Sequence, residues 1–560
     1  MSRTPAAALL GLVLGCLALG PALGRGFVLA QDMVFVPDPE FSRFTFGLSG
    51  GAPRVVPSDA VVTALSAVLP GELVQKAILL LVFMLGCSGA ARLVPSDGLG
   101  PGLVAGACYV WNPYVAERLL MGQWALLLGY AGLPWAVAAA SSPALSARQF
   151  AAAVLPAAVG GFAAMTVTAL TALPVAPAWR RVRRVCVVAL VLAVFSLPWL
   201  VPALLRPAAV TGDGVGVEAF AARADGPFGA VGSLLSLGGI WNAYAVPAGY
   251  GSPVGAAARL LLALAGVAGF AAFAGFSWRR RVVLREAGAD RGRAVEGRSA
   301  EGRSAEGRAG RGDGLPWRWG LAVAAVAGFG VACLGVTAPG RAVLTWLIHL
   351  WGGFAVFRDA QQFVAPLALL EAAGLGLAAA AASRALAGGG RWVAALVAVP
   401  LAVLPTMAWG GAGALRAVAY PVSWTAAREL VRGDPEPGDV LVLPFESYRR
   451  FPWNGGRPVL DPAQRFFGGR GREVVANDTV RVGHLIVPSE DDRAQMVERV
   501  LEAPSRSLAG AGFRYVVVDA GTPAERRDFD LRLRGAELVV DTPELRLYRF
   551  GGPIAQGSSE

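Results

Sequence analysis

Apolar residues fill most of the first 410 positions, in runs separated by short polar segments. A membrane-spanning helix needs about 20 such residues. We expect spans at 6–24, 73–91, 99–112, 124–140, 185–205, 253–277, 319–337, 362–383 and 392–410. The pattern predicts a polytopic α-helical membrane protein with roughly 9–11 spans. We interpret the first run as an uncleaved span rather than a signal peptide, because many spans follow it.

The run 149–179 does not read as one simple span. It contains Pro156, the pair Gly160-Gly161, Pro174 and Pro177. Proline and paired glycine break or kink a helix. We therefore predict a helical hairpin of two short pieces, with a single crossing as the alternative.

The last 150 residues have a different pattern. Short β-branched runs at 438–445, 512–520 and 536–550 are bounded by Gly, Pro and Asp, which is typical of strands. Residues 490–509 have helical spacing, and a hairpin turn is expected around Thr542-Pro543. We predict a transmembrane helical domain over 1–410, with an outer loop at 25–71, and an extracytoplasmic α/β domain over 411–560. No glycine-rich phosphate loop follows these strands, so nucleotide binding is not supported.

Charge distribution gives the orientation. Residues 412–560 hold 20 Arg against 21 Asp and Glu, whereas residues 1–411 hold 30 basic and 18 acidic residues. The basic excess gathers at Arg180, Arg181, Arg183 and Arg184, at eleven arginines in 278–318, and at Arg384 and Arg391. The positive-inside rule places these segments in the cytoplasm. With the hairpin, loop 25–71, residues 113–123, 206–252, 338–361 and the tail then face outward, in the plasma membrane. The excess reports orientation and contact with membrane lipids, not nucleic-acid binding.

Within the cytoplasmic loop, an imperfect Glu-Gly-Arg-Ser-Ala repeat lacks residues able to form a core, so we predict a disordered linker over about 282–315. All five cysteines lie in apolar runs, and no Cys/His cluster has zinc-ligand spacing.

Three acids follow the first span in loop 25–71: Asp32, Asp38 and Glu40. A carboxylate beside apolar surface tends to have a raised pKa and can act as a base. Pro37 and Pro39 equally favour an ordinary loop in which these acids cap turns.

The segment WNPYVAERLLMGQW at 111–124 interrupts two apolar runs with polar residues. Asn112-Pro113 suits the end of one span, and Trp111, Tyr114 and Trp124 are typical of the headgroup level. We therefore expect Glu117 and Arg118 to stay hydrated at the outer interface. They form either an anchoring pair or a phosphate-binding arginine oriented by its acid.

Two further polar clusters are candidates. Arg358, Asp359, Gln361 and Gln362 precede a late span on the same expected face, and Glu371 lies within that span. In the tail, residues 445–469 include Tyr448, Arg450, Trp453 and Asp461. This mixture suits either carbohydrate binding or packing of the tail onto the membrane domain.

These features together resemble the GT-C superfamily of membrane glycosyltransferases. The resemblance rests on QDMVFVPDPEF after the first span, short interrupted helices, FRDAQQF before a late span and an outward α/β domain; WNPYVAERLLMGQWALLLGY is similar to segments of actinobacterial proteins of this type. It implies a polyprenyl-phosphate sugar donor, an envelope acceptor on the outer face, and Asp32, then Asp38 and Glu40, as the base. Arg118, Arg358 and Glu117 would then bind the donor phosphate, and Tyr448, Arg450, Trp453 and Asp461 the acceptor. No adjacent acid pair is present, which leaves use of a divalent metal open.

Two alternatives remain. A lipid or polysaccharide transporter (flippase) requires a polar path through the bundle, but Glu371 is essentially the only charge within a predicted span. A non-catalytic envelope-assembly protein predicts that Asp32, Arg118 and Arg358 do not converge.

Overall fold

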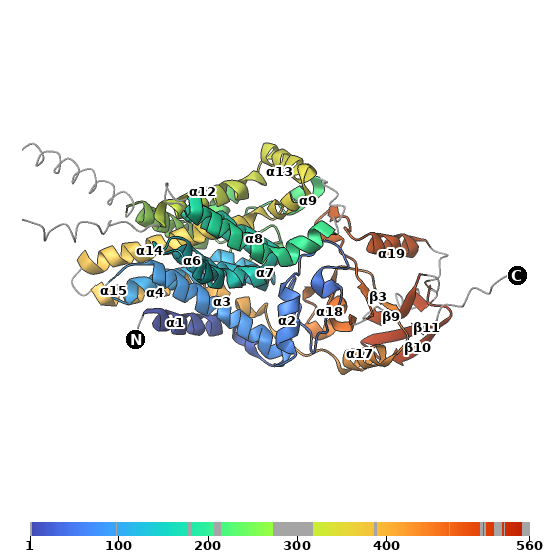
Figure 1. The fold of residues 1–560 in the computed structure, drawn as a ribbon. Coiled ribbons are helices and arrows are strands. Elements are labelled where there is room, and N and C mark those ends of the chain that lie inside the picture. The colour runs from blue at the N-terminus through green and yellow to red at the C-terminus, as the bar shows by residue number, and fades with distance from the viewer. Residues whose placement is uncertain are drawn as a thin grey trace, which may run out of the picture.

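The computed structural model describes residues 3–551 apart from 97, 177–181, 206–213, 273–316, 386–388, 470, 504–507, 509–510, 520–528 and 531. The predicted linker at 282–315 lies outside the described residues, as do Arg180 and Arg181. Long helices form one end of the molecule and the mixed sheet of the tail forms the other (Figure 1).

The helical region consists of apolar helices of very different lengths. Its elements are α1 (Arg3–Leu19), α2 (Ser58–Ser66), α3 (Gly71–Leu93), α4 (Gly100–Val110), α5 (Pro113–Leu120), α6 (Trp124–Ala140), α7 (Ala147–Val175), α8 (Val182–Leu205), α9 (Gly214–Ala219), α10 (Gly229–Leu235), the helix Pro253–Ala272, α12 (Arg318–Leu334), α13 (Ala338–Leu350), α14 (Ala365–Ala385), α15 (Gly389–Val403) and α16 (Ala408–Gly413).

By length and composition, six of the described helices could cross a membrane, or up to eight if each sharply bent pair is one span. This confirms a multi-pass helical protein but gives fewer spans than the sequence pattern. The difference arises partly at α4 and α6, which have 11 and 17 residues. At 1.5 Å per residue α4 extends only about 16 Å, which is short of the ~30 Å hydrocarbon core.

The segment α7 contains a break at Gly161, whose backbone leaves the helical region (φ 78°, ψ −153°). A Cβ placed on Gly129 of α6 would lie 3.3 Å from the Cα atoms of both Ala157 and Ala164. Those two Cα atoms are therefore at most twice that distance apart, whereas seven residues of straight helix rise about 10 Å. The chain thus folds back at Gly161, so α7, which counts as one of the six by length and composition, consists of two shorter helices and forms the hairpin that its glycine pair and prolines predicted.

The tail is an α/β unit built on a five-stranded mixed sheet. Strand order is β10 (Ala536–Asp541), β11 (Leu545–Phe550), β9 (Phe513–Asp519), β3 (Asp439–Leu443), β6 (Val474–Val475). The strand β3 runs parallel to β9 and β6, while β11 is antiparallel to its neighbours. The same unit contains three helices: α17 (Val422–Gly433), α18 (Ala463–Phe467) and α19 (Asp492–Glu502). The predicted strands, the helix and the hairpin at Thr542-Pro543 are confirmed. β-Branched runs bounded by Gly and Pro favour strands over helices, which explains why these elements could be predicted.

The tail packs directly onto the loop that follows α1. The strand β1 (Phe27–Val28) pairs with β2 (Ala417–Val418), and Gln31 bridges to Val459 of β5 (Pro458–Leu460). We call this contact zone, loop 25–71 against residues 445–469, the seam. Both α2 and α18 lie where the helical region meets the tail (Figure 1). The seam brings segments more than 400 residues apart in the sequence into one structure.

Candidate active site

A tight turn at the seam presents the Asp32 carboxyl group. Gln31 has φ 49°, and the amide of Asp32 donates to the carbonyl of Met121 at 3.0 Å. One Asp32 oxygen accepts a short hydrogen bond from the Tyr448 hydroxyl, on β4 (Tyr448–Arg450), and the other accepts from Nε2 of Gln123 at 3.2 Å. Burial raises the pKa of Asp32, although both hydrogen bonds oppose this shift. A partly exposed carboxyl with a raised pKa suits a base.

A glycine permits this close approach. Gly122 lies between α5 and α6 with φ 79°. A Cβ at this position would lie 2.3 Å from the Met33 nitrogen and 2.5 Å from the Ala30 oxygen. Any side chain would push away the turn that carries Asp32, so only glycine fits here.

The helix α5 begins where the sequence predicted a boundary. The Oδ1 of Asn112 accepts from the amide of Val115 at 3.0 Å and caps the helix, and Pro113 takes the first helical position. The expectation that Glu117 and Arg118 stay hydrated was wrong, because both side chains are fully buried. Asp359 and Gln361, which lie between α13 and α14, and the backbone amide of Ile240 replace water as their hydrogen-bond partners.

Arg118 is the centre of a buried polar network. Its guanidinium group pairs with both oxygens of Asp359, at 2.9 Å for the Nη2–Oδ1 contact, and donates to Oε1 of Gln361 and Oε1 of Gln123. Since Gln123 also donates to Asp32, an unbroken chain of hydrogen bonds joins Asp32 to Asp359. Bidentate pairing fixes the arginine in one orientation.

Glu117 lies next to Arg118 on α5 and also contacts Gln361. Its Oε2 accepts from the amide of Ile240 and from Nε2 of Gln361, both at 3.3 Å. Its Oε1 has no hydrogen-bond partner among the described residues. Burial, together with the neighbouring carboxylate of Asp225, raises the pKa of Glu117 well above its usual value. Where two carboxylates meet, one proton is shared or a cation intervenes.

Arg358 lies in a separate ion-pair cluster. It contacts Glu490 at 3.1 Å, and Arg54 of the outer loop contacts the same carboxylate at 2.7 Å. The structure therefore couples Arg358 to the tail, and it couples Arg118 to Asp32. These two arginines belong to different networks at the same end of the helical region.

The other two loop acids lie apart from Asp32. Asp38 is exposed and 3.8 Å from Arg428, and Glu40 pairs with Arg432 at 3.0 Å. Both arginines belong to α17 of the tail. These contacts favour tethering of the loop over proton transfer.

The four candidate residues in the tail have different environments. Only Tyr448 contacts Asp32. The Trp453 ring packs in an aromatic cluster with Phe451 and Trp424, and Asp461 faces Arg449 at 3.7 Å in the interior of the tail. Arg450 is exposed and lies over the Tyr244 ring. The packing interpretation fits Trp453 and Asp461, while Tyr448 and Arg450 remain open to a ligand.

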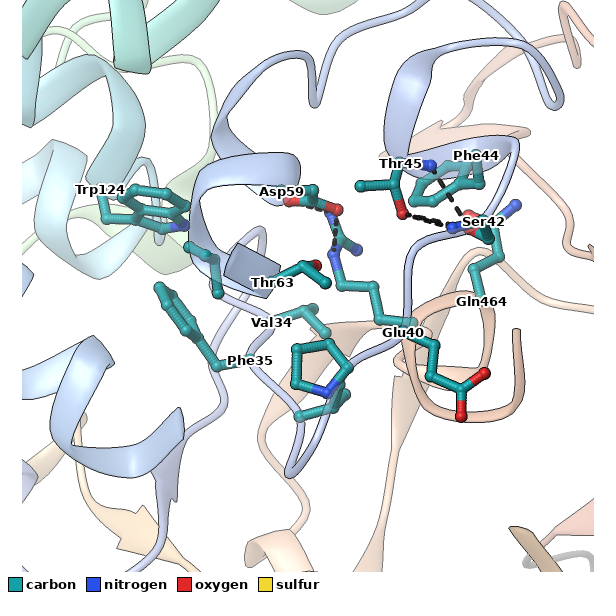
Figure 2. Close-up of a pocket in the computed structure, with 14 residues that line it drawn as sticks. Val34, Phe35, Glu40, Ser42, Phe44, Thr45, Asp59, Thr63, Trp124 and Gln464 are labelled. Atoms are coloured by element: carbon teal, nitrogen blue, oxygen red, sulfur yellow. Dashed lines mark hydrogen bonds and ion pairs between the residues drawn. The ribbon is translucent and has the colours of Figure 1, made fainter. Parts of the chain in front are cut away.

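A small, partly open cavity lies beside this turn, between loop residues 34–63 and α18. Figure 2 shows Trp124 and Phe35 on one side and Phe44, Ser42 and Gln464 on the other. Asp59, whose pKa burial raises, pairs with Arg465 in its wall at 2.7 Å. Ring faces beside hydroxyl and amide groups suit a polyhydroxylated ligand. Trp124 directly follows Gln123, so the cavity adjoins the Asp32 network.

Within the part of the chain that the structure describes, no group of three or more His, Cys, Asp and Glu side chains could hold a metal ion. Glu117 and Asp225 are the two carboxylates best placed to share a cation, which would need further oxygen ligands from water or substrate.

No family model and no curated protein matches this chain. Among solved structures, the fold resembles that of the arabinofuranosyltransferase AftD from mycobacteria. The similarity to AftD extends over 99% of this chain, with a TM-score of 0.55 and 17% identity. A mutant form of AftD gives a TM-score of 0.54, 17% identity and the same coverage of this chain. The chain spans about two fifths of the length of AftD, with 40% and 42% of the two AftD chains covered.

At this identity the likeness to AftD shows the fold alone, and it supports the GT-C-like membrane fold that the sequence resembles. Several residues of the site were missed by sequence reasoning: Gln123 as a bridge, and Arg54, Asp225 and Glu490. Gln123 reaches Asp32 from 91 residues away, and Arg54, Asp225 and Glu490 are also far from their partners in the sequence, so no local pattern could have identified them.

Proposed function

We propose that the protein is a membrane glycosyltransferase that moves a sugar from a polyprenyl-phosphate donor to an envelope acceptor. The observation that carries the proposal is the Asp32 carboxyl, held by Tyr448 and Gln123 beside a cavity and joined to a buried arginine. An AftD-like fold over nearly the whole chain supports the same class of reaction.

In this proposal Asp32 accepts the proton of an acceptor hydroxyl. The hydroxyl oxygen bonds to the anomeric carbon of the sugar as the bond to the lipid phosphate breaks, and the phosphate departs with the electron pair. Tyr448 and Gln123 each bond one Asp32 oxygen and leave further lone pairs for the proton. Positive groups near the departing phosphate stabilise its charge. Arg118 and Arg358 fill this role, with Glu117 orienting the neighbouring segment.

In this proposal the acceptor binds in the cavity of Figure 2, and Tyr448 and Arg450 are the tail residues that contact it outside the cavity. A pentofuranosyl donor is the first to test, because the neighbouring structure is an arabinofuranosyltransferase. The arginine clusters support a cytoplasmic linker, and in this proposal the seam and the tail face outward from the plasma membrane.

The test compares two asparagine variants in the same loop. Membranes containing wild-type protein, D32N or D38N receive a polyprenyl-phosphate pentofuranose with a labelled sugar and an oligosaccharide acceptor. General-base loss predicts a fall in transfer of about 10²–10⁴-fold for D32N and little change for D38N. Full activity of D32N, or equal losses in both variants, would remove Asp32 from the mechanism. A transporter would instead translocate labelled lipid equally well in all three.

A further inference from the structure

A second, small cavity lies in the helical region. It is lined by α4, α14, α15 and the helix Pro253–Ala272, with the start of α5 at one end, and it is partly open. Most of its wall is apolar, from residues such as Leu262, Leu375 and Val403. Two charged side chains, Arg259 and Glu371, also line it.

Arg259 is a buried cation that has no counter-ion among the described residues. Its side chain is 6% exposed, and Nη2 donates only to the carbonyl of Tyr250, with the guanidinium carbon 3.5 Å from that ring centroid. Its Nε has no partner, and no ion pair to Arg259 occurs among the described residues. A buried charge is costly unless it is paired.

Glu371 presents a carboxyl group to the same space. It is 5% exposed, lies two turns into α14 and has an Oε1 atom without a hydrogen-bond partner. Arg259 and Glu371 form no ion pair with each other in the described part of the chain. The cavity therefore offers one free donor for an anion and one free acceptor for a hydroxyl or ammonium group.

The arginines of the seam contrast with Arg259. Arg118 is paired with Asp359 and two amides, and Arg358 is paired with Glu490. Among the described residues no carboxylate is paired with Arg259, so an anion would meet no competing ion pair there.

The position of the cavity indicates where its ligand comes from. On the helix Pro253–Ala272, Leu261 and Leu264 are 66% and 45% exposed, so one helix separates the cavity from the lipid phase. A ligand with an apolar chain fits the aliphatic wall, and a charged head fits the two unpartnered groups.

We infer that this cavity binds the head of a phosphate-bearing lipid, with the phosphate on Arg259 and a hydroxyl or ammonium group of the head on Glu371. The site stands on its own residues and does not require Asp32 to be catalytic. Both a polyprenyl phosphate and an ordinary anionic phospholipid carry the required phosphate.

The test measures lipid adducts of the purified full-length protein by native mass spectrometry. The probes are undecaprenyl phosphate, phosphatidylglycerol and phosphatidic acid, each added to wild type, R259Q, R259K, E371Q and R341Q. Arg341 is the matched control, because it lies outside the cavity and its Nη1 bonds only backbone carbonyls. Loss of a charge-assisted bond predicts roughly 10–100-fold weaker binding of every probe by R259Q.

R259K, which keeps the charge, should bind between R259Q and wild type, and R341Q should bind as wild type does. E371Q should weaken phosphatidylglycerol binding and spare phosphatidic acid, which carries no alcohol on its head. Preference for undecaprenyl phosphate identifies an isoprenoid ligand, and preference for phosphatidylglycerol identifies a bulk lipid. Equal binding by R259Q and R341Q, or no adduct with wild type, would overturn the inference. D32N should bind as wild type does, so failure here is separable from failure of the proposed reaction.

Discussion

Two buried arginines anchor polar networks on opposite sides of the seam, and their surroundings differ. Arg449 in the tail is held by Asp519 and Asp461, which are 0% and 6% exposed in their side chains. Arg118 shares its donors among Asp359, Gln361 and Gln123, and its network continues to the half-buried Asp32. The Arg449 network is buried in the tail, whereas Val34 and Trp124, which lie close in the sequence to Asp32 and Gln123 of the Arg118 network, line a cavity. In our proposal only the Arg118 network is accessible to a substrate.

The largest expected effect is on stability and concerns the Arg449 network. R449Q leaves Asp519 and Asp461 buried without their cation, so the unfolding free energy should fall by about 3–5 kcal/mol. The measurement is the thermal unfolding of the purified full-length protein. The double variant R449Q/D519N should recover part of the loss. A melting temperature equal to wild type in R449Q would show that this pair does not support the tail.

A substitution in the Arg118 network is expected to reduce activity rather than stability. R118Q should lose about 10²–10³-fold in transfer per folded molecule, because a preorganised donor near the departing phosphate is gone. R449Q should keep wild-type transfer per folded molecule. Activity normalised to the folded fraction measures both. Equal specific activities in the two variants would abolish the distinction between the networks.

A backbone change sharpens the comparison without altering any charge. In G122A the new Cβ meets Met33 and Ala30 and displaces the turn that carries Asp32. A shift of about 1 Å predicts up to roughly 10²-fold slower turnover. The control is G455A, which also has a positive φ, of 65°, but has open space around it. An equal loss of turnover in both variants would mean that backbone strain, not displacement of Asp32, slows the reaction. Wild-type turnover in G122A would contradict the role of this turn.

The pH dependence of transfer tests the state of Asp32. Burial raises the pKa of Asp32, so the carboxyl is protonated, and cannot accept a proton, over a wider acidic range than a solvated aspartate. The rate should fall with acidification through a midpoint above 3.8, the ordinary value. A rate independent of pH down to that value would contradict a role for this group as base.

The smallest effect is expected at the exposed tether. Arg432 and Glu40 are 26% and 40% exposed in their side chains, and such pairs contribute about 0–1 kcal/mol. R432Q should therefore change the melting temperature and transfer little. A large loss of transfer would place Glu40 in the mechanism after all.

The sequence predicted the local features well. The Asn112-Pro113 helix start, the fold-back at Gly160-Gly161 and the strand around residues 438–445 all follow from short-range preferences of the residues involved. The helix lengths were predicted less well, because apolar composition does not distinguish a span from a shorter buried helix such as α4.

The environment of the charged residues could not be predicted. The 111–124 segment contains tryptophan and tyrosine at the expected spacing, which favours a hydrated interface, yet Arg118 is buried because Asp359 and Gln361 arrive from 240 residues away. Glu490 and Asp225 are equally remote from their partners. The periodicity of residues in a single sequence does not reveal long-range contacts of this kind.

The hydrogen bond between Tyr448 and Asp32 joins residues 416 positions apart. A ribosome adding 5–20 residues per second needs roughly 20–80 s to synthesise the chain between them. During this time the first helices can already insert, but the carboxyl lacks one of its two orienting partners. The protein should thus gain its complete site only after the tail has been synthesised and has folded against the loop that follows the first helix. Assembly order, rather than a separate inhibitor, would keep a half-made chain inactive.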